Sequence, residues 1–352
     1  MIKKILTATF GTCCLLALAF GAVYLVDNRM PAFRLDGSVI IGPDTGIEEV
    51  FSQLDSLQPV SSSSLRRVFK EENVQERMKP GSYQVKADYT AKYVARAFTH
   101  NWQTPVKLTI SGTVRTLDEL SEKLDPQILL SAEEIKTAFS DPGTLSRCGL
   151  TAEQLFAVIL PDTYEVYWNA SAEDLLKRFK KEYDAFWTPE RKEQAAAQGL
   201  TPFQVSIIAS IVAQESNIPA EYPLIASVYI SRLKKGMKLQ ACPTVCYIYD
   251  YKIRRVLYSH LANPSPYNTY VHEGLPPSPI CIPEKVHIEA VLSPDRNGYL
   301  YFCADPALNG RNVFSKTFAE HSRYAEQYRS AISARGALAQ QQQADEKREN
   351  NI

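Results

Sequence analysis

The chain lacks an excess of either charge, and this absence excludes two classes of partner. Its 39 Lys and Arg residues balance 39 Asp and Glu residues, so the formal net charge is zero. Proteins that bind nucleic acid normally carry a basic excess, because contacts with phosphates dominate their affinity. No acidic tract suits the storage of cations either. We therefore expect no nucleic-acid partner.

The sequence also lacks the spacing of Cys and His that is typical of a zinc site. Seven cysteines are present, and Cys13 and Cys14 fall in an apolar N-terminal run. The pair in CPTVC (242–246) is not followed by a second Cys or His pair at ligand spacing. We therefore expect no metal and no cofactor. The other cysteines could form disulfides outside a membrane, and the sequence leaves their pairing open.

A long apolar run follows the first four residues. Residues 5–26 contain no charged side chain, and as a helix they would extend about 33 Å, enough to cross a hydrocarbon core of about 30 Å. A cleavable signal peptide has a shorter apolar region. Lys3 and Lys4 favour a cytoplasmic N-terminus for residues 1–4. We predict a single-pass anchor in the inner (cytoplasmic) membrane, with the rest of the chain outside the cytoplasm.

The remaining chain has an α+β pattern. After a short linker at 27–35, residues 36–104 alternate brief strand-like and helical runs and contain no cluster of nucleophiles or metal ligands. The expected elements are strands at 37–43 and 81–85 and helices at 47–54, 62–72 and 90–98. We interpret this part as a binding or spacing module. A mixed α/β domain is expected over 105–335, followed by a disordered polar tail at 336–352.

One carboxylate stands at the end of an otherwise apolar helix pattern. Thr201, Pro202 and Gln204 form the start signals of a helix, including a capping box. The apolar residues that follow cover most of its circumference, and Glu215 projects from the buried side near its C-terminal end. Burial and the negative end of the helix dipole both raise the pKa of a carboxyl there. The pattern leaves two roles open, a structural cap and a proton donor.

Seven motifs in one order connect this helix with a known family. They are PDTYEVYW (161–168), IASIVAQES (208–216), SRLKKGMKLQACPTV (231–245), YNTY (267–270), GLPPSPI (274–280), YLYF (299–302) and FSKTFAEH (314–321). In this order they resemble the YceG-like family of endolytic murein transglycosylases. The resemblance implies one N-terminal anchor, a LysM-like module, here 36–104, and a catalytic domain, here 105–335.

The resemblance also implies a catalytic residue. The family acid is the second glutamate of a Val-Glu-x-Glu motif, which matches Val212 to Glu215 with Ala213 at the first acidic position. Glu215 is therefore expected to be the proton donor. Side chains expected to hold the substrate, each with a structural role equally open, are Gln240, Tyr267, Asn268, Thr269, Tyr270 and Asp162.

The implied reaction is cleavage of the bond between MurNAc and GlcNAc inside peptidoglycan strands, leaving 1,6-anhydroMurNAc ends and terminating nascent strands. Expected partners are glycan strands, the bilayer through residues 5–26, and the cell-wall synthesis machinery. One alternative is a hydrolytic muramidase, with Asp162, Asp250 or Glu221 as a second carboxylate. Another is a silent wall-binding scaffold. It is suggested by departures from the family pattern at Phe156-Ala157, Ser231 and Asn312.

Overall fold

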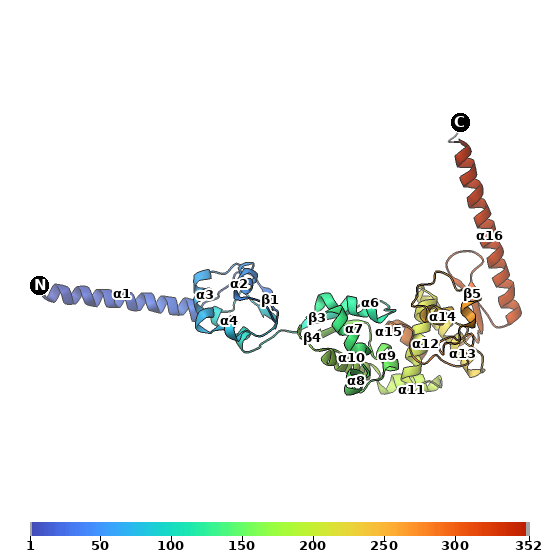
Figure 1. Cartoon of the computed structure of the whole chain (residues 1–352), viewed down its shortest axis with the longest axis horizontal. Helices are drawn as coiled ribbons and strands as arrows, with labels where there is room; N and C mark the ends of the chain where they lie inside the picture. Colours follow the sequence, from blue (N-terminus) through green and yellow to red (C-terminus); the bar gives the residue numbers. More distant parts are fainter. Residues whose placement is uncertain (1, 350–352) are drawn as a thin grey trace. The chain divides into compact units, whose positions relative to one another are not determined.

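The computed structural model describes residues 2–349, with side chains described for residues 11–335. It is a mixed α+β chain that divides into two compact units (Figure 1). The first unit contains Met1–Leu108, Leu124–Ser131 and Thr163–Ser171, and the second contains Thr109–Lys123, Ala132–Asp162 and Ala172–Ile352. The expected boundary near residue 104 is close to the main crossing. The sequence-based prediction divided the chain at single positions, so it could not assign Leu124–Ser131 and Thr163–Ser171 to the first unit.

Helix α1 (Ile2–Asn28) contains the apolar run. Its window Gly11–Asn28 has the length and composition of a membrane span. The helix extends beyond the predicted limit at residue 26, and it leads directly into the first unit. The side chains of residues 1–10, including the two lysines of the orientation argument, lie outside the described residues.

The predicted linker at 27–35 packs against the first unit instead of connecting it loosely. Asp27 is 3% exposed and accepts hydrogen bonds from Arg67 Nε at 2.7 Å and from the Ser64 hydroxyl. Phe33 is also 3% exposed and belongs to the hydrophobic core of this unit. The sequence predicted a short linker here. The buried carboxylate of Asp27, which pairs with Arg67, and the buried ring of Phe33 give the segment a fixed position instead.

Apart from α1, the first unit combines two antiparallel strands with four helices. Strands β1 (Gly37–Ile41) and β2 (Gly81–Val85) pair with Val39 opposite Tyr83, and their alternate side chains enter the core. The helices are α2 (Ile47–Asp55), α3 (Ser62–Glu71), α4 (Val74–Arg77) and α5 (Ala91–Thr99). These elements confirm the strands and helices that the sequence predicted. Strands β3 (Val106–Ile110) and β4 (Asp162–Val166) form another two-stranded sheet.

The second unit is mainly helical and carries one hairpin. Its centre is α12 (Pro202–Glu215), which packs against α13 (Tyr222–Lys234) and α15 (Lys285–Leu292). The hairpin pairs β5 (Tyr301–Ala304) with β6 (Asn312–Ser315). The other helices are α6 (Leu117–Leu124), α7 (Ala132–Ser140), α8 (Pro142–Arg147), α9 (Leu155–Val158), α10 (Ala172–Phe186), α11 (Pro189–Ala197), α14 (Cys242–Ile248) and α16 (Phe318–Glu349). Short 3₁₀ turns are Ala152–Gln154, Pro219–Glu221 and His260–Ala262 in this unit, and Asp125–Gln127 in the first.

The ends of the central helices follow from local chemistry. The Thr201 hydroxyl accepts from the backbone N–H of Gln204, and the Gln204 side chain accepts from that of Thr201, as the predicted capping box requires. Helix α13 stops before Gly236, whose φ of +65° suits glycine after a helix C-terminus. Helix α16 continues into the segment 336–352, where Ala, Gln, Glu and Lys are good helix formers. Because the side chains there lie outside the described residues, the disorder of this tail stays a prediction.

Candidate active site

Glu215 is the last residue of α12, and its carboxylate is held by the neighbouring helix α13. The hydroxyl of Tyr229 donates to Glu215 Oε1 at 2.6 Å. Burial raises the pKa of the Glu215 carboxyl to about 7, and the hydrogen bond from Tyr229 opposes this rise. Burial and the Glu215 carboxylate raise the pKa of Tyr229 well above its usual value, so its hydroxyl stays the donor. Glu215 therefore exchanges a proton near neutral pH.

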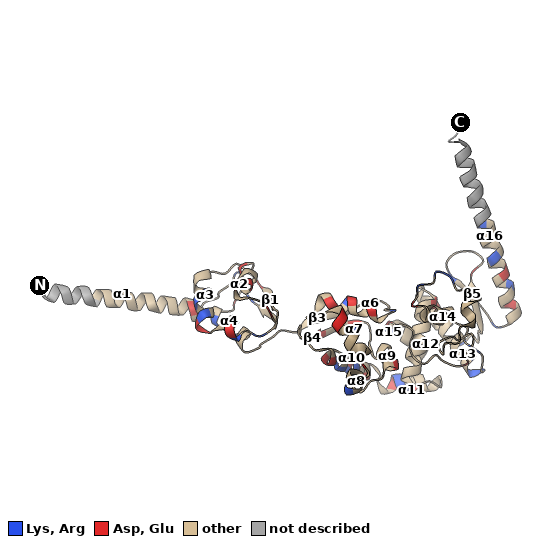
Figure 2. Cartoon of the chain, viewed as in Figure 1, with Lys and Arg blue, Asp and Glu red and all other residues tan. Residues whose placement is uncertain are grey.

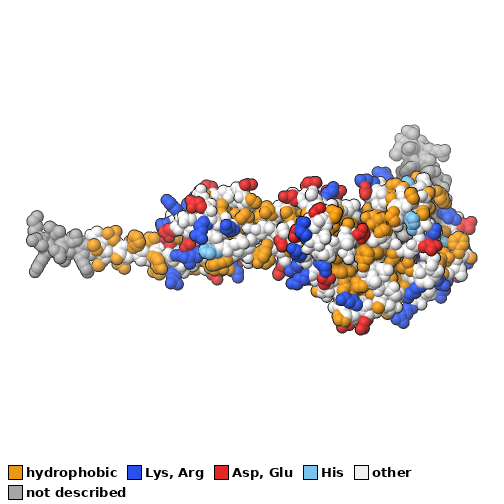
Figure 3. Space-filling view, turned by 60° about the horizontal axis from the view of Figure 1, so that its bottom comes forward, with side chains coloured by type: hydrophobic (Ala, Val, Ile, Leu, Met, Phe, Trp, Pro, Cys, Tyr) orange, Lys and Arg blue, Asp and Glu red, His pale blue; other side chains and the backbone are white. Residues whose placement is uncertain are grey.

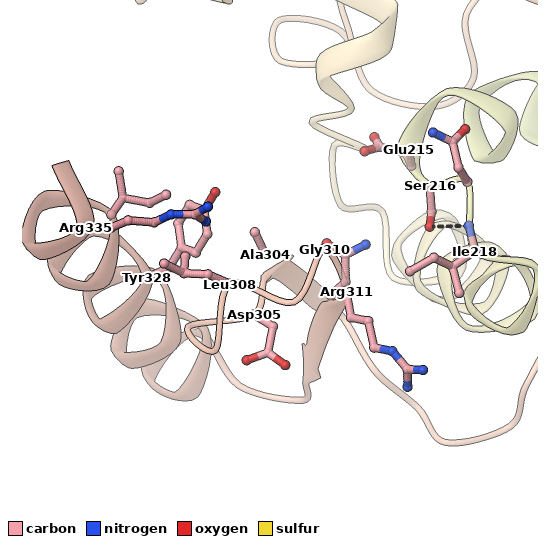
Figure 4. A pocket seen from close by; sticks show the side chains of 13 residues that line it. Glu215, Ser216, Ile218, Ala304, Asp305, Leu308, Gly310, Arg311, Tyr328 and Arg335 are labelled. Carbon is pink, nitrogen blue, oxygen red and sulfur yellow. Dashed lines mark hydrogen bonds between the residues drawn. The ribbon is translucent and has the colours of Figure 1, made fainter. Parts of the chain in front are cut away.

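Two surface cavities share Glu215 as a lining residue. The first, of about 450 Å³, lies between the end of α12, the β5–β6 hairpin and α16, from which Tyr328 and Arg335 line it (Figure 4). The second, of about 420 Å³, is lined by residues of α13, the loop at 239–242, β5 and α16. Ala304 and Asn312 also line both cavities. The carboxyl of Glu215 thus stands where two adjoining hollows meet.

Arg232 connects the segments that line the second cavity through hydrogen bonds. Its buried guanidinium donates to the backbone carbonyls of Leu300 at 2.7 Å, Leu239 at 2.9 Å and Lys238 at 3.1 Å. It also donates to Gln240 Oε1 at 3.2 Å and lies 5.1 Å from the centre of the Tyr301 ring. The five donors of one planar group can serve several carbonyls at once. One side chain of α13 therefore positions both the loop that carries Gln240 and strand β5.

The buried carboxylate of Glu221 binds the first residue of strand β6. It accepts from Asn312 backbone N at 2.8 Å, from Asn312 Nδ2 at 2.7 Å and from the Ser216 hydroxyl at 2.8 Å. Asn312, one of the departures from the family pattern, thus supplies two donors to Glu221. Because these three donors occupy both of its oxygens, Glu221 is a structural carboxylate here and a poor candidate for a second catalytic base.

The structure brings two of the six predicted substrate residues into the cavities around Glu215. Gln240 and Tyr270 both line the second cavity. The Tyr270 hydroxyl lies 3.0 Å from the sulfur of Cys242, which lines the same cavity. Tyr267 lines a different cavity with Arg115 and Tyr251, and its hydroxyl lies 2.7 Å from that of Ser278.

Three other predicted residues have different roles. Asn268 is 0% exposed, and its side-chain amide donates to the carbonyls of Leu261 and Asn263. Thr269 is 2% exposed, and its hydroxyl accepts from the backbone N–H of Ala241 at 3.0 Å. Both side chains shape the loop and have no surface for a sugar. Asp162 is exposed, pairs with Lys285, and lines neither cavity beside Glu215. The structure thus favours a structural role for Asn268 and Thr269, while direct substrate contact at these three positions stays a prediction.

Sequence reasoning missed several residues beside Glu215. Tyr229 lies within an ordinary apolar helix pattern, and nothing in that pattern distinguishes it from a core tyrosine. Arg232 and His321 fall inside the motifs SRLKK and FSKTFAEH, so the motif positions were a usable signal. His321 lines the second cavity, and its ring stacks on Tyr301 at 5.4 Å between centroids. Cys242 also lines it, and burial raises the pKa of its thiol.

The arrangement suits chemistry that needs one carboxyl. Besides Glu215, the acidic residue among those lining these cavities is Asp305, which lines the first. Its oxygens accept from Ala307 N at 2.9 Å and Asn309 Nδ2 at 2.8 Å. Figure 4 shows its carboxylate pointing away from Glu215. Asp250 lines the separate cavity with Tyr267. Within the described residues, no three His, Cys, Asp or Glu side chains are grouped to hold a metal ion.

Replacing Tyr229 by Phe is expected to raise the pKa of Glu215 further, because the donor that stabilises its carboxylate is lost. Carbon-13 NMR titration of the glutamate carboxyls measures this pKa, with the Glu215 signal assigned from Glu215→Gln. Tyr222→Phe is the matched control, since Tyr222 lies on the same helix and its ring contacts His287. An unchanged or lowered pKa in Tyr229→Phe would contradict the role of the hydroxyl.

Comparisons with known proteins show which family the chain belongs to. The model of the YceG-like family matches residues 39–327. A relative from Bacillus subtilis named endolytic murein transglycosylase is 35% identical over 211 residues, covering 59% of this chain and 57% of the relative. One of the same name from Streptococcus pneumoniae is 26% identical over 175 residues, covering 48% and 31%. The chain thus matches less than two thirds of the length of these relatives.

The fold also has a counterpart among solved structures. A crystal structure of a yceG-like protein from Listeria monocytogenes aligns with a TM-score of 0.52 and 24% identity, covering 82% of this chain and 98% of that one. At this identity the likeness shows the fold alone. The family model, in contrast, covers most of the chain, from β1 in the first unit to α16 in the second. The chain therefore belongs to the YceG-like family.

Proposed function

We propose that the protein is a membrane-anchored lytic transglycosylase that cuts within peptidoglycan strands. The observation that carries the proposal is Glu215, a carboxyl whose pKa burial raises to about 7 at the junction of two cavities. A general acid works best when its pKa lies near the working pH. The relatives from Bacillus subtilis and Streptococcus pneumoniae, both named endolytic murein transglycosylase, support the same substrate class.

In the proposed reaction one carboxyl serves twice. Glu215 donates its proton to the oxygen that joins MurNAc to the next GlcNAc, and the bond from that oxygen to C1 of MurNAc breaks. The 6-hydroxyl of the same MurNAc attacks C1, which closes a 1,6-anhydro ring. Its proton passes to the Glu215 carboxylate, which restores the acid. Water takes no part, so no second carboxylate is required, in contrast to the usual hydrolytic pair.

The two cavities would hold sugars on either side of the bond that breaks. Gln240 and Tyr270 offer polar groups in the second cavity, and Ser216 and Arg311 offer them in the first. Tyr229 keeps the carboxyl of Glu215 oriented through its 2.6 Å hydrogen bond. Such prior positioning contributes to the rate because the reacting groups need not search for each other.

The location of the cut follows from the anchor. Helix α1 would hold the protein in the cytoplasmic membrane with its N-terminus inside and both units outside, which restricts cleavage to glycan near the membrane. New strands are made there, so cleavage would terminate their elongation beside the synthesis machinery. The first unit, which we interpret as LysM-like, would bind or space the glycan.

The products distinguish this proposal from its alternatives. Purified protein incubated with peptidoglycan should release fragments that end in 1,6-anhydroMurNAc, detected by mass spectrometry as a loss of one water relative to a reducing end. A muramidase would produce reducing ends, and a silent scaffold would bind glycan and release nothing. Fragments with reducing ends only would refute the transglycosylase assignment.

A further inference from the structure

Helix α1 is joined rigidly to the first unit at the point where it would leave the membrane. Asp27 lies one residue before the end of the helix, buried, with its two carboxylate oxygens on Arg67 Nε at 2.7 Å and Nη2 at 2.8 Å. Asn28 accepts from Lys92 Nζ at 2.9 Å. Helix α1 is thereby tied to both α3 and α5. Moving α1 away from the unit would break all of these hydrogen bonds together.

The backbone after the helix is fixed as well. The N–H of Ala32 donates to the carbonyl of Tyr89 at 2.8 Å, and the N–H of Val60 donates to the carbonyl of Ala32 at 2.9 Å. The loop that precedes α3 therefore lies beside the end of α1. The depth at which α1 sits in the bilayer therefore also determines how far this loop lies from the lipid surface.

Apolar side chains are exposed at this junction. Met30 is 51% exposed and Val60 is 53% exposed, and both line a shallow hollow with Val26 and Pro31. Figure 3 shows hydrophobic side chains along the described part of α1 up to the first unit. The apolar surface of the span thus continues onto the unit itself. In water these side chains would remain hydrated, whereas a membrane interface would cover them.

Cationic groups accompany this apolar surface. Arg29 is exposed, and Arg67 keeps 43% of its side chain exposed while it pairs with Asp27. Figure 2 shows Lys and Arg gathered where the first unit begins, next to α1. Such groups at the end of a span favour the lipid headgroup region, where anionic phosphates lie.

We propose that Met30, Pro31 and Val60, with Arg29 and Arg67, form a membrane collar that docks into the headgroup region of the bilayer. The first unit then rests on the lipid surface and is not suspended from a tether. The inference rests on the proposed anchoring by α1 and adds a contact between the folded unit and lipid. Its occupant is the bilayer, because the collar is continuous with the apolar surface of the spanning helix.

The test uses the full chain in vesicles of phosphatidylethanolamine and phosphatidylglycerol that contain a diazirine phospholipid with its photoreactive group near the headgroup. After illumination, adducts are located by peptide mass spectrometry. We expect adducts on α1 and on the peptides containing residues 29–31 and 60. Ile40 is the matched reference, since it is apolar, 41% exposed and in the same unit, but on β1. Its peptide should show only the background measured in detergent.

Substitutions then separate the collar from the anchor. Met30→Asn with Val60→Asn should reduce collar adducts to the detergent background and leave those on α1, whereas Ile40→Asn should change neither. Adducts confined to α1 in the unaltered chain would overturn the collar and leave the anchor standing. No adducts on α1 would refute the proposed anchoring itself. Equal labelling of Ile40 and Val60 would also overturn the collar, because it would show that lipid contacts the first unit on more than the collar surface.

Discussion

Glu215→Gln is expected to abolish glycan cleavage while the chain stays folded and still binds glycan. Gln has nearly the same size and can still accept the hydrogen bond from Tyr229, but it cannot donate the proton that the leaving oxygen needs. General acid–base catalysis is worth about 10²–10⁴-fold, and the loss should reach the upper end of that range. Release of anhydro-ended fragments, followed by mass spectrometry, measures it. Cleavage near the unaltered rate would falsify the assignment.

The matched control for this variant is Asp250→Asn. Asp250 is exposed, lines the separate cavity with Tyr267, and is a carboxylate that a muramidase could use. We expect its removal to leave cleavage unchanged. If both variants lose activity and the unaltered protein yields reducing ends, a hydrolytic pair explains the data better than a single acid.

The pH dependence follows from the same carboxyl. Glu215 must be protonated to act, and its protonated fraction falls as pH rises through a pKa of about 7. Cleavage should therefore decline above pH 7, approaching about tenfold per pH unit.

The same carboxyl makes the stability of the fold depend on pH. Because the pKa of Glu215 in the folded state exceeds the ordinary value of 4.5, the folded state binds this proton more tightly than the unfolded state, and stability is lost as pH rises from about 4.5 through 7. Glu215→Gln removes that loss and should be at least as stable as the unaltered protein at pH 8. A glutamate with a structural role would instead make the variant less stable.

Arg232→Met is expected to lower the free energy of unfolding of the second unit by about 3 kcal/mol or more, because each buried carbonyl left without a donor costs about 1–3 kcal/mol. The substitution keeps an apolar stem but leaves the carbonyls of Lys238, Leu239 and Leu300 without their buried donor. Hydrogen exchange of the α12 and α13 amides measures this local stability. Cleavage should fall as well, because the loop that carries Gln240 loses its support.

Arg191→Met is the control for Arg232. Arg191 also donates to a backbone carbonyl, that of Phe186, and its guanidinium lies 4.1 Å from the centre of that ring. It pairs with Glu289, yet its side chain is 32% exposed. Water can replace its bonds, so we expect a loss of about 1 kcal/mol. Equal effects of the two substitutions would contradict the view that Arg232 holds the cavity through buried carbonyls.

The sequence predicted those parts of the fold that depend on neighbours along the chain. The capping box of Thr201 and Gln204 and the strands predicted at 37–43 and 81–85 depend on short-range patterns, and the structure confirms them, the first strand ending at Ile41. Tyr229 meets Glu215 only because α12 and α13 pack together, and no local pattern reports that contact. Asn268 and Thr269 lie in a recognisable motif, but only the folded loop reveals that both are buried. Likewise, the buried carboxylate of Asp27 pairs with Arg67, a residue 40 positions away, and no local pattern reports this pair.

The two cavities that meet at Glu215 have a consequence for how a polymer enters. Both open at the surface, and the carboxyl of Glu215 lines both of them and does not stand at the end of a closed tunnel. Under the proposed function, a glycan strand would be laid in sideways at any position along its length, without a free terminus being threaded through. Scission of that kind divides long strands into long pieces at once, so that average strand length falls well before short oligosaccharides accumulate.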